Sequence, residues 1–103
     1  MNDIPADIFE KIKGFDWDEA NVYKNWQRHK VSFLECEEIL FNEPLVIAPD
    51  HVHSQTEDRY YVLGKTDSGR LLFLVFTIRD DKIRVISARD MNKKERREYL
   101  EKT

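Results

Sequence analysis

The sequence predicts an α+β domain in which helices pack on one face of an antiparallel sheet of about four strands. Before Pro44, apolar residues recur at helical spacing and follow capping motifs. After Pro44, the sequence has runs typical of strands. The turns between these runs are short, so neighbouring strands are expected to be antiparallel. A final helical segment at the C-terminus completes the expected order of elements.

The N-terminal part is expected to hold two to three helices. Ile4, Ile8 and Ile12 lie four apart before Gly14, which predicts a short helix over residues 5–12.

Asp16 with Glu19 has the form of a helix N-cap with its supporting acid, and it predicts a helix to about Arg28. The spacing along this helix predicts an inward face of Val22, Trp26 and His29.

A second capping box is formed by Ser32 and Glu35, and this helix should end before Pro44. It would bury Cys36, which we interpret as a small core residue and not as a nucleophile.

Four segments after Pro44 have the pattern of strands, and the turn signals Thr66–Gly69 and Asp80–Asp81 separate the last three. Their expected ranges are 45–48, 57–65, 70–79 and 82–89. Asn92 with Glu95 then predicts a helix to about Lys102.

Pairing these strands across their turns assigns side chains to the two faces of the sheet. Pairs Lys65–Arg70 and Arg79–Lys82 would give a core face of Leu72, Leu74, Phe76, Ile78, Ile83 and Val85. The other face would carry Tyr60, Arg79, Lys82 and Arg84 around an apolar floor, with no helix assigned to it. The same pairing puts Arg59 and Arg89 on the core side. Arginines bind phosphate and a tyrosine can stack on an unpaired base, so the uncovered face is a candidate RNA surface. The alternative is that the charged residues at the strand ends serve only to prevent aggregation.

The chain of 103 residues has room for one hydrophobic core, so we expect one domain over residues 1–103. The N-terminus has no basic and apolar leader and no long apolar run follows, which predicts a cytoplasmic protein that makes no membrane contact. The net charge of −3 is unevenly distributed: residues 1–58 sum to −8 and residues 59–103 sum to +5. An anion is therefore expected to bind the C-terminal half, where the last helix adds Lys93, Arg96 and Arg97.

Common nucleotide, hydrolase and zinc motifs are absent from the sequence. His51 and His53 form a weak metal-ligand pattern that is more typical of a polar loop, so no metal site and no cofactor is expected.

Three strings in one order, residues 15–33, 57–77 and 83–102, resemble the BrnT toxins of type II toxin–antitoxin systems. They contain W-D-E, R-H-x-V-S-F, G-R-L-L-F-L-V-F-T, and I-R-V-I-S-A-R with E-R-R-x-Y. The resemblance implies a RelE-like fold and a ribonuclease that stops translation. It also implies neutralisation by a BrnA-like antitoxin with a ribbon-helix-helix DNA-binding region, through which operator DNA is bound only indirectly. Lys30 and Cys36 depart from the family pattern, and residues 1–14 have the form of an N-terminal helical extension.

Metal-free RNA cleavage needs a base for the 2′-hydroxyl, cations for the phosphorane and a proton for the leaving 5′-oxygen. We predict His29 or Tyr99 as base or acid, with Arg59, Arg79 and Arg89 around the phosphate. The alternative is a binding module that has lost catalysis and only partners a DNA-binding antitoxin.

Overall fold

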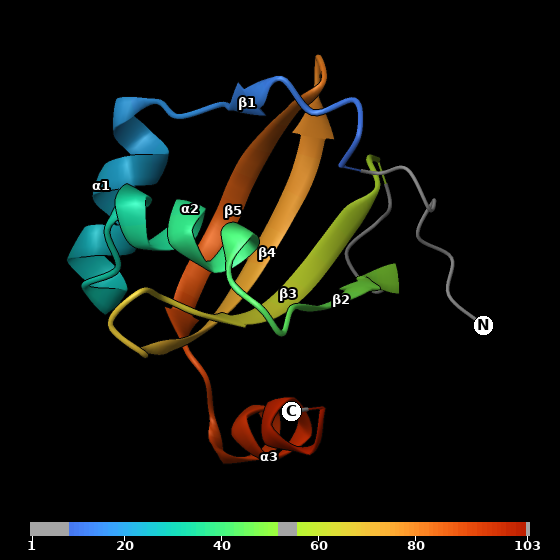
Figure 1. The fold of residues 1–103 in the computed structure, drawn as a ribbon. Coiled ribbons are helices and arrows are strands. Elements are labelled where there is room, and N and C mark those ends of the chain that lie inside the picture. Colours follow the sequence, from blue (N-terminus) through green and yellow to red (C-terminus); the bar gives the residue numbers. More distant parts are fainter. Residues whose placement is uncertain (1–8, 52–55, 103) are drawn as a thin grey trace.

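A computed structural model describes residues 9–51 and 56–102 of the chain. It contains a five-stranded sheet of order β1-β5-β4-β3-β2 and three helices (Figure 1). The strands are β1 (Gly14–Phe15), β2 (Val46–Pro49), β3 (Arg59–Lys65), β4 (Leu71–Arg79) and β5 (Lys82–Asp90). The helices are α1 (Glu19–His29), α2 (Phe33–Phe41) and α3 (Lys93–Glu101).

The expected α+β class is confirmed, but a sheet of about four antiparallel strands is wrong in detail. Strand β1 adds a fifth strand, and it pairs parallel to β5 through Gly14–Lys82 and Phe15–Ile83. A two-residue strand is too short to show alternation, so the sequence pattern could not predict it. The helix expected over 5–12 lies largely outside the described residues, and residues 9–11 form a turn.

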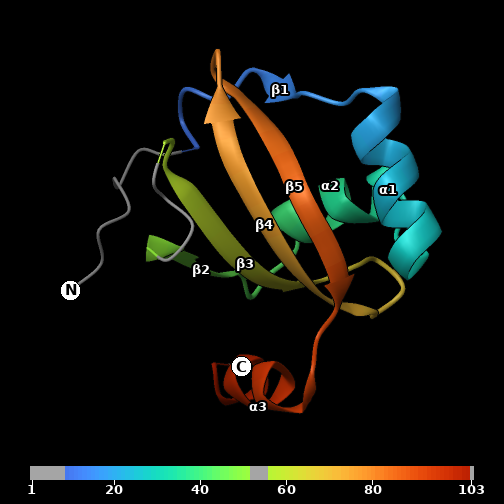
Figure 2. The same ribbon diagram turned by 180° about the vertical axis from the view of Figure 1, so that it is seen from behind.

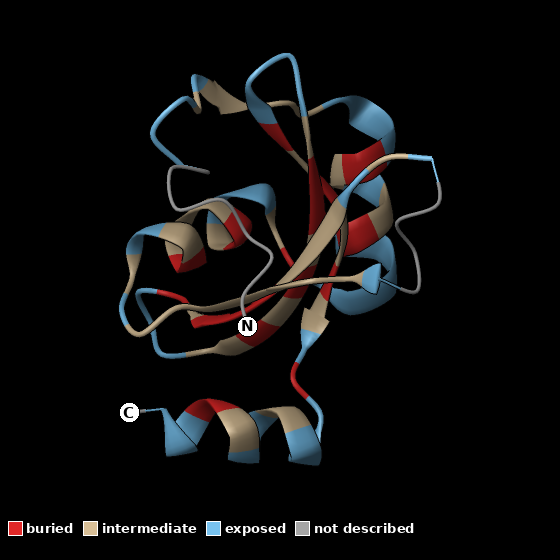
Figure 3. Ribbon diagram, turned by 90° about the vertical axis from the view of Figure 1, so that its right-hand side faces the viewer, coloured by how far each residue is buried: buried red, intermediate tan, exposed pale blue. Residues whose placement is uncertain are grey.

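Helices α1 and α2 lie on one side of the sheet, and α3 lies beyond one end of the central strands (Figures 1 and 2). The main core forms between α2 and the sheet from Val31, Cys36, Ile39, Val62, Leu72, Leu74, Phe76, Ile83, Val85 and Ala88. A second cluster of Leu63, Met91 and Tyr99 lies where α3 meets the sheet. Figure 3 shows both buried groups, in the central strands and on the inward sides of the helices.

Two capping boxes form as predicted, one at Ser32 with Glu35 and one at Asn92 with Glu95. The N-cap of α1 is Asp18 instead of Asp16, because Asp18 and Asn21 bond each other's backbone N–H groups at 2.8 and 2.9 Å.

The register between β3 and β4 differs by one residue from the expected one. Thr66 and Arg70 close the turn, since the N–H of Arg70 donates to Thr66 Oγ1 at 3.0 Å and the N–H of Thr66 donates to the Arg70 carbonyl at 2.9 Å. Lys65 therefore pairs with Leu71. This shift exchanges the two faces of β3, so Tyr60 lies on the core face and Tyr61 on the other.

A β-bulge corrects the prediction for β5 in the same way. Val85 pairs with Phe76 and Ser87 pairs with Val75, so Ile86 is an extra residue. Beyond the bulge, Arg89 lies opposite Phe73 on the face away from α1 and α2. We refer to this face as the open face; it carries Arg59, Tyr61, Phe73, Val75, Arg79, Ser87 and Arg89. Among the described residues, α3 covers its end at Leu63.

The inward face of α1 is polar, which corrects the expected face of Val22, Trp26 and His29. Asn21 and Asn25 are buried, whereas the Trp26 side chain is 48% exposed. The cause is the outer edge of β5, opposite β4, to which no strand of the described residues pairs beyond Ile83. Asn21 Nδ2 donates to the Val85 carbonyl at 3.3 Å and the N–H of Ala88 donates to Asn25 Oδ1 at 3.2 Å, so side chains of α1 replace a neighbouring strand.

Candidate active site

A pocket of about 350 Å³ lies on the open face and is lined by Asp50, Arg59, Phe73, Val75, Ile86, Ser87 and Arg89. We refer to it as the open-face pocket. It brings together Arg59 from β3 and Arg89 from β5, the two arginines that the expected pairing had put on the core side. Phe73 and Val75 of the strand between them provide an apolar surface.

Arg89 is held on two sides. Its guanidinium carbon lies 4.2 Å from the centre of the Phe73 ring, and its Nη atoms donate to both carboxylate oxygens of Glu95 at 2.8 and 2.9 Å. Burial tends to raise the pKa of Glu95, but the hydrogen bonds from Arg89 and from the Asn92 backbone outweigh it, so the pKa lies below its ordinary value. A charged, bidentate pair fixes the guanidinium plane at the edge of the pocket.

Glu57 links the other arginines of the open face. It accepts two hydrogen bonds from Arg79, both 3.1 Å, and one of its oxygens lies 3.7 Å from Nη2 of Arg59. The hydrogen bond from Arg79 lowers the pKa of the Glu57 carboxyl, which therefore carries its charge at neutral pH. Arg79 is thus oriented toward Glu57, at the rim of the site.

Tyr61 is the tyrosine that lies on the open face, and the prediction of Tyr60 for this place is wrong. Tyr60 stacks on Phe76 of the core face at 5.5 Å between ring centres. Tyr61 stacks on Phe73 at 5.8 Å. Burial, and after it the nearby carboxylates of Glu98, Asp50 and Glu95, raise the pKa of Tyr61, so its phenol keeps its proton at neutral pH.

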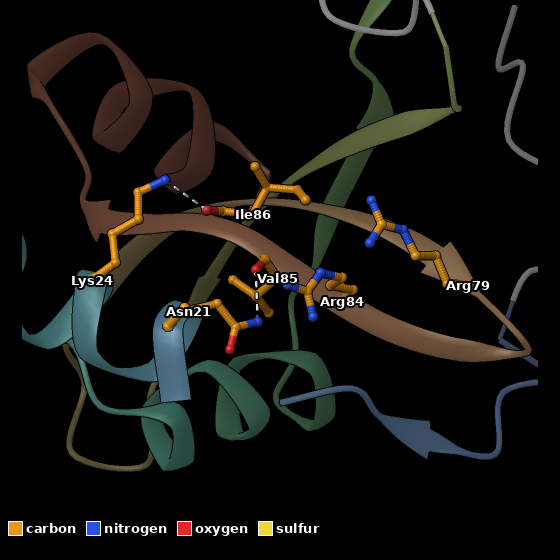
Figure 4. Close-up of a pocket in the computed structure, with 7 residues that line it drawn as sticks. Asn21, Lys24, Arg79, Arg84, Val85 and Ile86 are labelled. Atoms are coloured by element: carbon orange, nitrogen blue, oxygen red, sulfur yellow. Dashed lines mark hydrogen bonds between the residues drawn. The ribbon is translucent and has the colours of Figure 1, made fainter. Parts of the chain in front are cut away.

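A second pocket of about 290 Å³, the edge pocket, lies beside the bulge and is lined by Ala20, Asn21, Lys24, Arg79, Arg84, Val85 and Ile86 (Figure 4). Ile86 lines both pockets, so the two adjoin. Arg84 is also paired: its Nη2 donates to Asp18 at 2.8 Å, and its Nη1 lies 3.6 Å from Asp16. Lys82 is exposed at the start of β5, and Lys93, Arg96 and Arg97 are exposed on α3.

Neither residue predicted as base or acid reaches the open-face pocket. Tyr99 is 1% exposed and its hydroxyl donates to the Pro44 carbonyl at 2.7 Å, which makes it an anchor of α3. His29 is exposed at the end of α1, where its carbonyl accepts from Arg70. The prediction placed His29 on the core side of a helix that in fact buries its asparagines.

Cys36 is fully buried, and burial raises the pKa of its thiol to about 12, as expected of a core residue. Within residues 9–51 and 56–102, no three His, Cys, Asp or Glu side chains are grouped so that they could hold a metal ion. Of the two loop histidines, His51 is exposed and His53 lies outside the described residues.

Sequence reasoning did not assign the carboxylates Asp50, Glu57 and Glu95 to the RNA site. Asp50 continues the pairing of β2 with β3, since its N–H donates to the Arg59 carbonyl at 2.8 Å. Residues opposite each other on neighbouring strands share a face, so Asp50 lies beside Arg59. A signal existed in the E-x-R spacing of Glu57 and Arg59, but we assigned only basic and aromatic residues and His29 to the RNA site.

The fold and the pocket define a small α+β protein that presents arginines and aromatic rings on an uncovered sheet face, a type of site suited to phosphate and bases. Residues 17–95 match the family model described as ribonuclease toxin, BrnT, of type II toxin–antitoxin system. The chain therefore belongs to this family of ribonuclease toxins.

Among solved structures, the chain is similar to the Brucella abortus ribonuclease toxin BrnT, whose crystal structure was determined at 1.1 Å. The TM-score is 0.59 at 20% identity, over 78% of this chain and 97% of that one, which is a likeness of fold. No curated protein matches the sequence. No helix in the part of the chain that the structure describes is long and apolar enough to cross a membrane.

Proposed function

We propose that the chain is one domain over residues 1–103 with a RelE-like fold, and that it cleaves RNA in the open-face pocket without a metal and thereby inhibits translation in the cytoplasm. The observation that carries this proposal is the convergence of Arg59 and Arg89 on one pocket, across an apolar strand. Two guanidinium groups on opposite sides of a cavity can bind one phosphate from both sides.

In this proposal the scissile phosphate lies between Arg59 and Arg89. Both arginines donate to its oxygens and stabilise the charge that builds up on the phosphorane, which is the part that a metal would otherwise supply. Tyr61 and Phe73, already stacked, offer a surface for a neighbouring base. The remaining cations extend the positive surface along the RNA: Arg79, Lys82, Arg84, Lys93, Arg96 and Arg97.

The partner implied by the family is an antitoxin. We propose that it is a BrnA-like protein with a ribbon-helix-helix region, that it covers the open face, and that the complex binds operator DNA through the antitoxin alone. Induced expression should then stop growth, and co-expression of the neighbouring antitoxin gene should restore it.

One observation favours the alternative of a catalytically inactive binding module. The arginines of the open face are each close to a carboxylate, Arg79 and Arg59 to Glu57 and Arg89 to Glu95. Such pairs compete with a phosphate for the guanidinium groups. A binding module would form the antitoxin complex and leave RNA intact.

Purified, partner-free protein incubated with labelled RNA and EDTA separates the two. We expect cleavage that EDTA does not reduce, and a loss of about 10²–10³-fold in Arg89→Gln, the effect of removing one donor to a transition-state oxyanion. Arg28→Gln is the matched control, because Arg28 is exposed on α1 away from the pocket. Intact RNA with every variant would favour the binding module, and cleavage that returns only with added metal would contradict the metal-free mechanism.

A further inference from the structure

We infer that Asp50 is the general base of the reaction, the group that removes the proton from the attacking 2′-hydroxyl; this inference rests on the proposed function. The reaction needs such a group, and arginine cannot be one because its pKa stays above about 12. Tyr99 is buried between α3 and the sheet, with its hydroxyl bonded to the Pro44 carbonyl, and His29 is at the end of α1, so a different residue must act.

Asp50 has the right position. It lines the open-face pocket together with Arg59 and Arg89, and among the described residues it is the acidic one that does so. Its backbone N–H donates to the Arg59 carbonyl at 2.8 Å, so the end of β2 holds it next to the arginine that would bind the phosphate. In RNA the carbon that bears the 2′-hydroxyl is bonded directly to the carbon that bears the scissile 3′-phosphate. A carboxylate beside the phosphate site is therefore also beside the 2′-hydroxyl.

The other two carboxylates of the open face have different tasks. Both oxygens of Glu57 accept hydrogen bonds from Arg79, and both oxygens of Glu95 accept from Arg89. These hydrogen bonds stabilise the charged form and lower the pKa of each carboxyl, which makes each a weaker proton acceptor. They orient arginines, and neither lines the pocket.

The step balances without a further reactant. The Asp50 carboxylate takes the 2′-hydroxyl proton as the 2′-oxygen bonds to phosphorus, and the bond from phosphorus to the 5′-oxygen breaks. The products are a 2′,3′-cyclic phosphate and a 5′-hydroxyl. Water gives the proton to the 5′-oxygen, and Asp50 returns its proton to water.

The test compares Asp50→Asn with Asp58→Asn in the full chain. Both changes remove one negative charge near Arg59, but Asp58 is exposed and does not line the pocket. The substrate is a short RNA with a fluorescent label, and the same sequence with a 2′-deoxy sugar at the cleavage position measures binding without reaction.

We expect Asp50→Asn to lower kcat by about 10²–10⁴-fold, the usual contribution of a general base, with binding of the 2′-deoxy analogue kept within about threefold. Asp58→Asn should keep both within about threefold. Asp50→Glu should recover part of the lost kcat, because it restores a carboxylate.

Near-normal kcat in Asp50→Asn, while Arg89→Gln is inactive, would overturn the inference and leave the proposed ribonuclease intact. Loss of analogue binding or of the folded state in Asp50→Asn, without recovery in Asp50→Glu, would also overturn it, since that is a structural role. If wild type leaves RNA intact, the proposed function itself fails.

Discussion

Arg70 connects α1, α2 and β5 by hydrogen bonds, and we expect its loss to weaken the packing of these elements most. Its guanidinium donates to the carbonyls of His29 and Lys30 at 3.1 and 2.8 Å, to Asp90 at 2.7 Å and to Glu35 at 3.2 Å. The Arg70 side chain is only 27% exposed. One side chain thus links the end of α1, the start of α2 and the end of β5.

We predict that Arg70→Met lowers the free energy of unfolding by about 2–3 kcal/mol at pH 7. The Asp90 side chain is 62% exposed, so its pair is screened and contributes at most about 1 kcal/mol. The Glu35 side chain is 24% exposed, so leaving its charge without Arg70 costs more, roughly 1–1.5 kcal/mol. Loss of the hydrogen bonds to the two backbone carbonyls adds about 0.5 kcal/mol together, because water can replace the donor. For a domain of this size the melting temperature should fall by roughly 10–20 °C.

This loss should depend on pH in a definite direction. The hydrogen bond from Arg70 lowers the pKa of Asp90; for Glu35 burial acts in the opposite sense, but the bonds from Ser32 and Arg70 outweigh it and its pKa is lowered too. A carboxyl with a lowered pKa in the folded state contributes stability above its unfolded pKa, near 4, and loses it as the pH falls through the folded value. The difference between wild type and Arg70→Met should therefore be complete at pH 7 and much smaller at pH 3.

Urea denaturation followed by circular dichroism at the two pH values measures both quantities, with Arg97→Met as the control on an exposed arginine of α3. A loss below about 0.5 kcal/mol at pH 7, the ordinary range for surface changes, would refute the reasoning. So would an equal loss at pH 7 and pH 3.

Three further predictions concern the site and the sheet. Arg89→Lys keeps the charge but cannot hold Glu95 with two parallel bonds or lie flat on Phe73, so RNA cleavage should fall by about 10²-fold in kcat; an unchanged rate would show that charge alone suffices. Tyr61→Phe should bind a non-cleavable RNA nearly as well as wild type in a fluorescence titration, whereas Tyr61→Ala should bind it about 1–3 kcal/mol more weakly; equal losses would assign the role to the hydroxyl. Gly64→Ala should lower the free energy of unfolding in urea by about 1–3 kcal/mol, because the added Cβ would meet Ile39 backbone oxygen at 3.2 Å; a neutral result would mean that α2 moves freely against β3.

Local signals in the sequence predicted the parts of the fold that local contacts determine. The capping boxes at Ser32 and Asn92 depend on residues three positions apart, and both formed as expected. The four strands after Pro44 and their turns were also placed within about two residues, because alternation and turn residues lie next to each other in the chain.

The faces of the sheet depended on two details that no local pattern contains. Thr66 closes the first turn one residue later than expected, and Ile86 is inserted in β5. Each shift of one residue exchanges inside and outside, and this is why Tyr61 took the place of Tyr60 and why Arg89 reached the open face.

The candidate site was also predicted well by residue type and poorly where it depends on contacts between distant residues. Arginines that could bind phosphate were recognised by residue type and by family resemblance, and two of them line the open-face pocket. The carboxylate beside them was missed because Asp50 comes near Arg59 only through the pairing of β2 with β3.

The amide side chains that α1 lends to the edge of β5 have a consequence for how the protein behaves in solution. A bare strand edge is a template on which other chains can polymerise into intermolecular sheets. Here Asn21 and Asn25 occupy those backbone groups, and Lys24 Nζ reaches the Ile86 carbonyl at 3.4 Å with a charge that other strands avoid. The inward face of α1 therefore opposes self-association of the protein through β5. Substitutions that make this face of α1 more apolar would remove that protection and should favour aggregation.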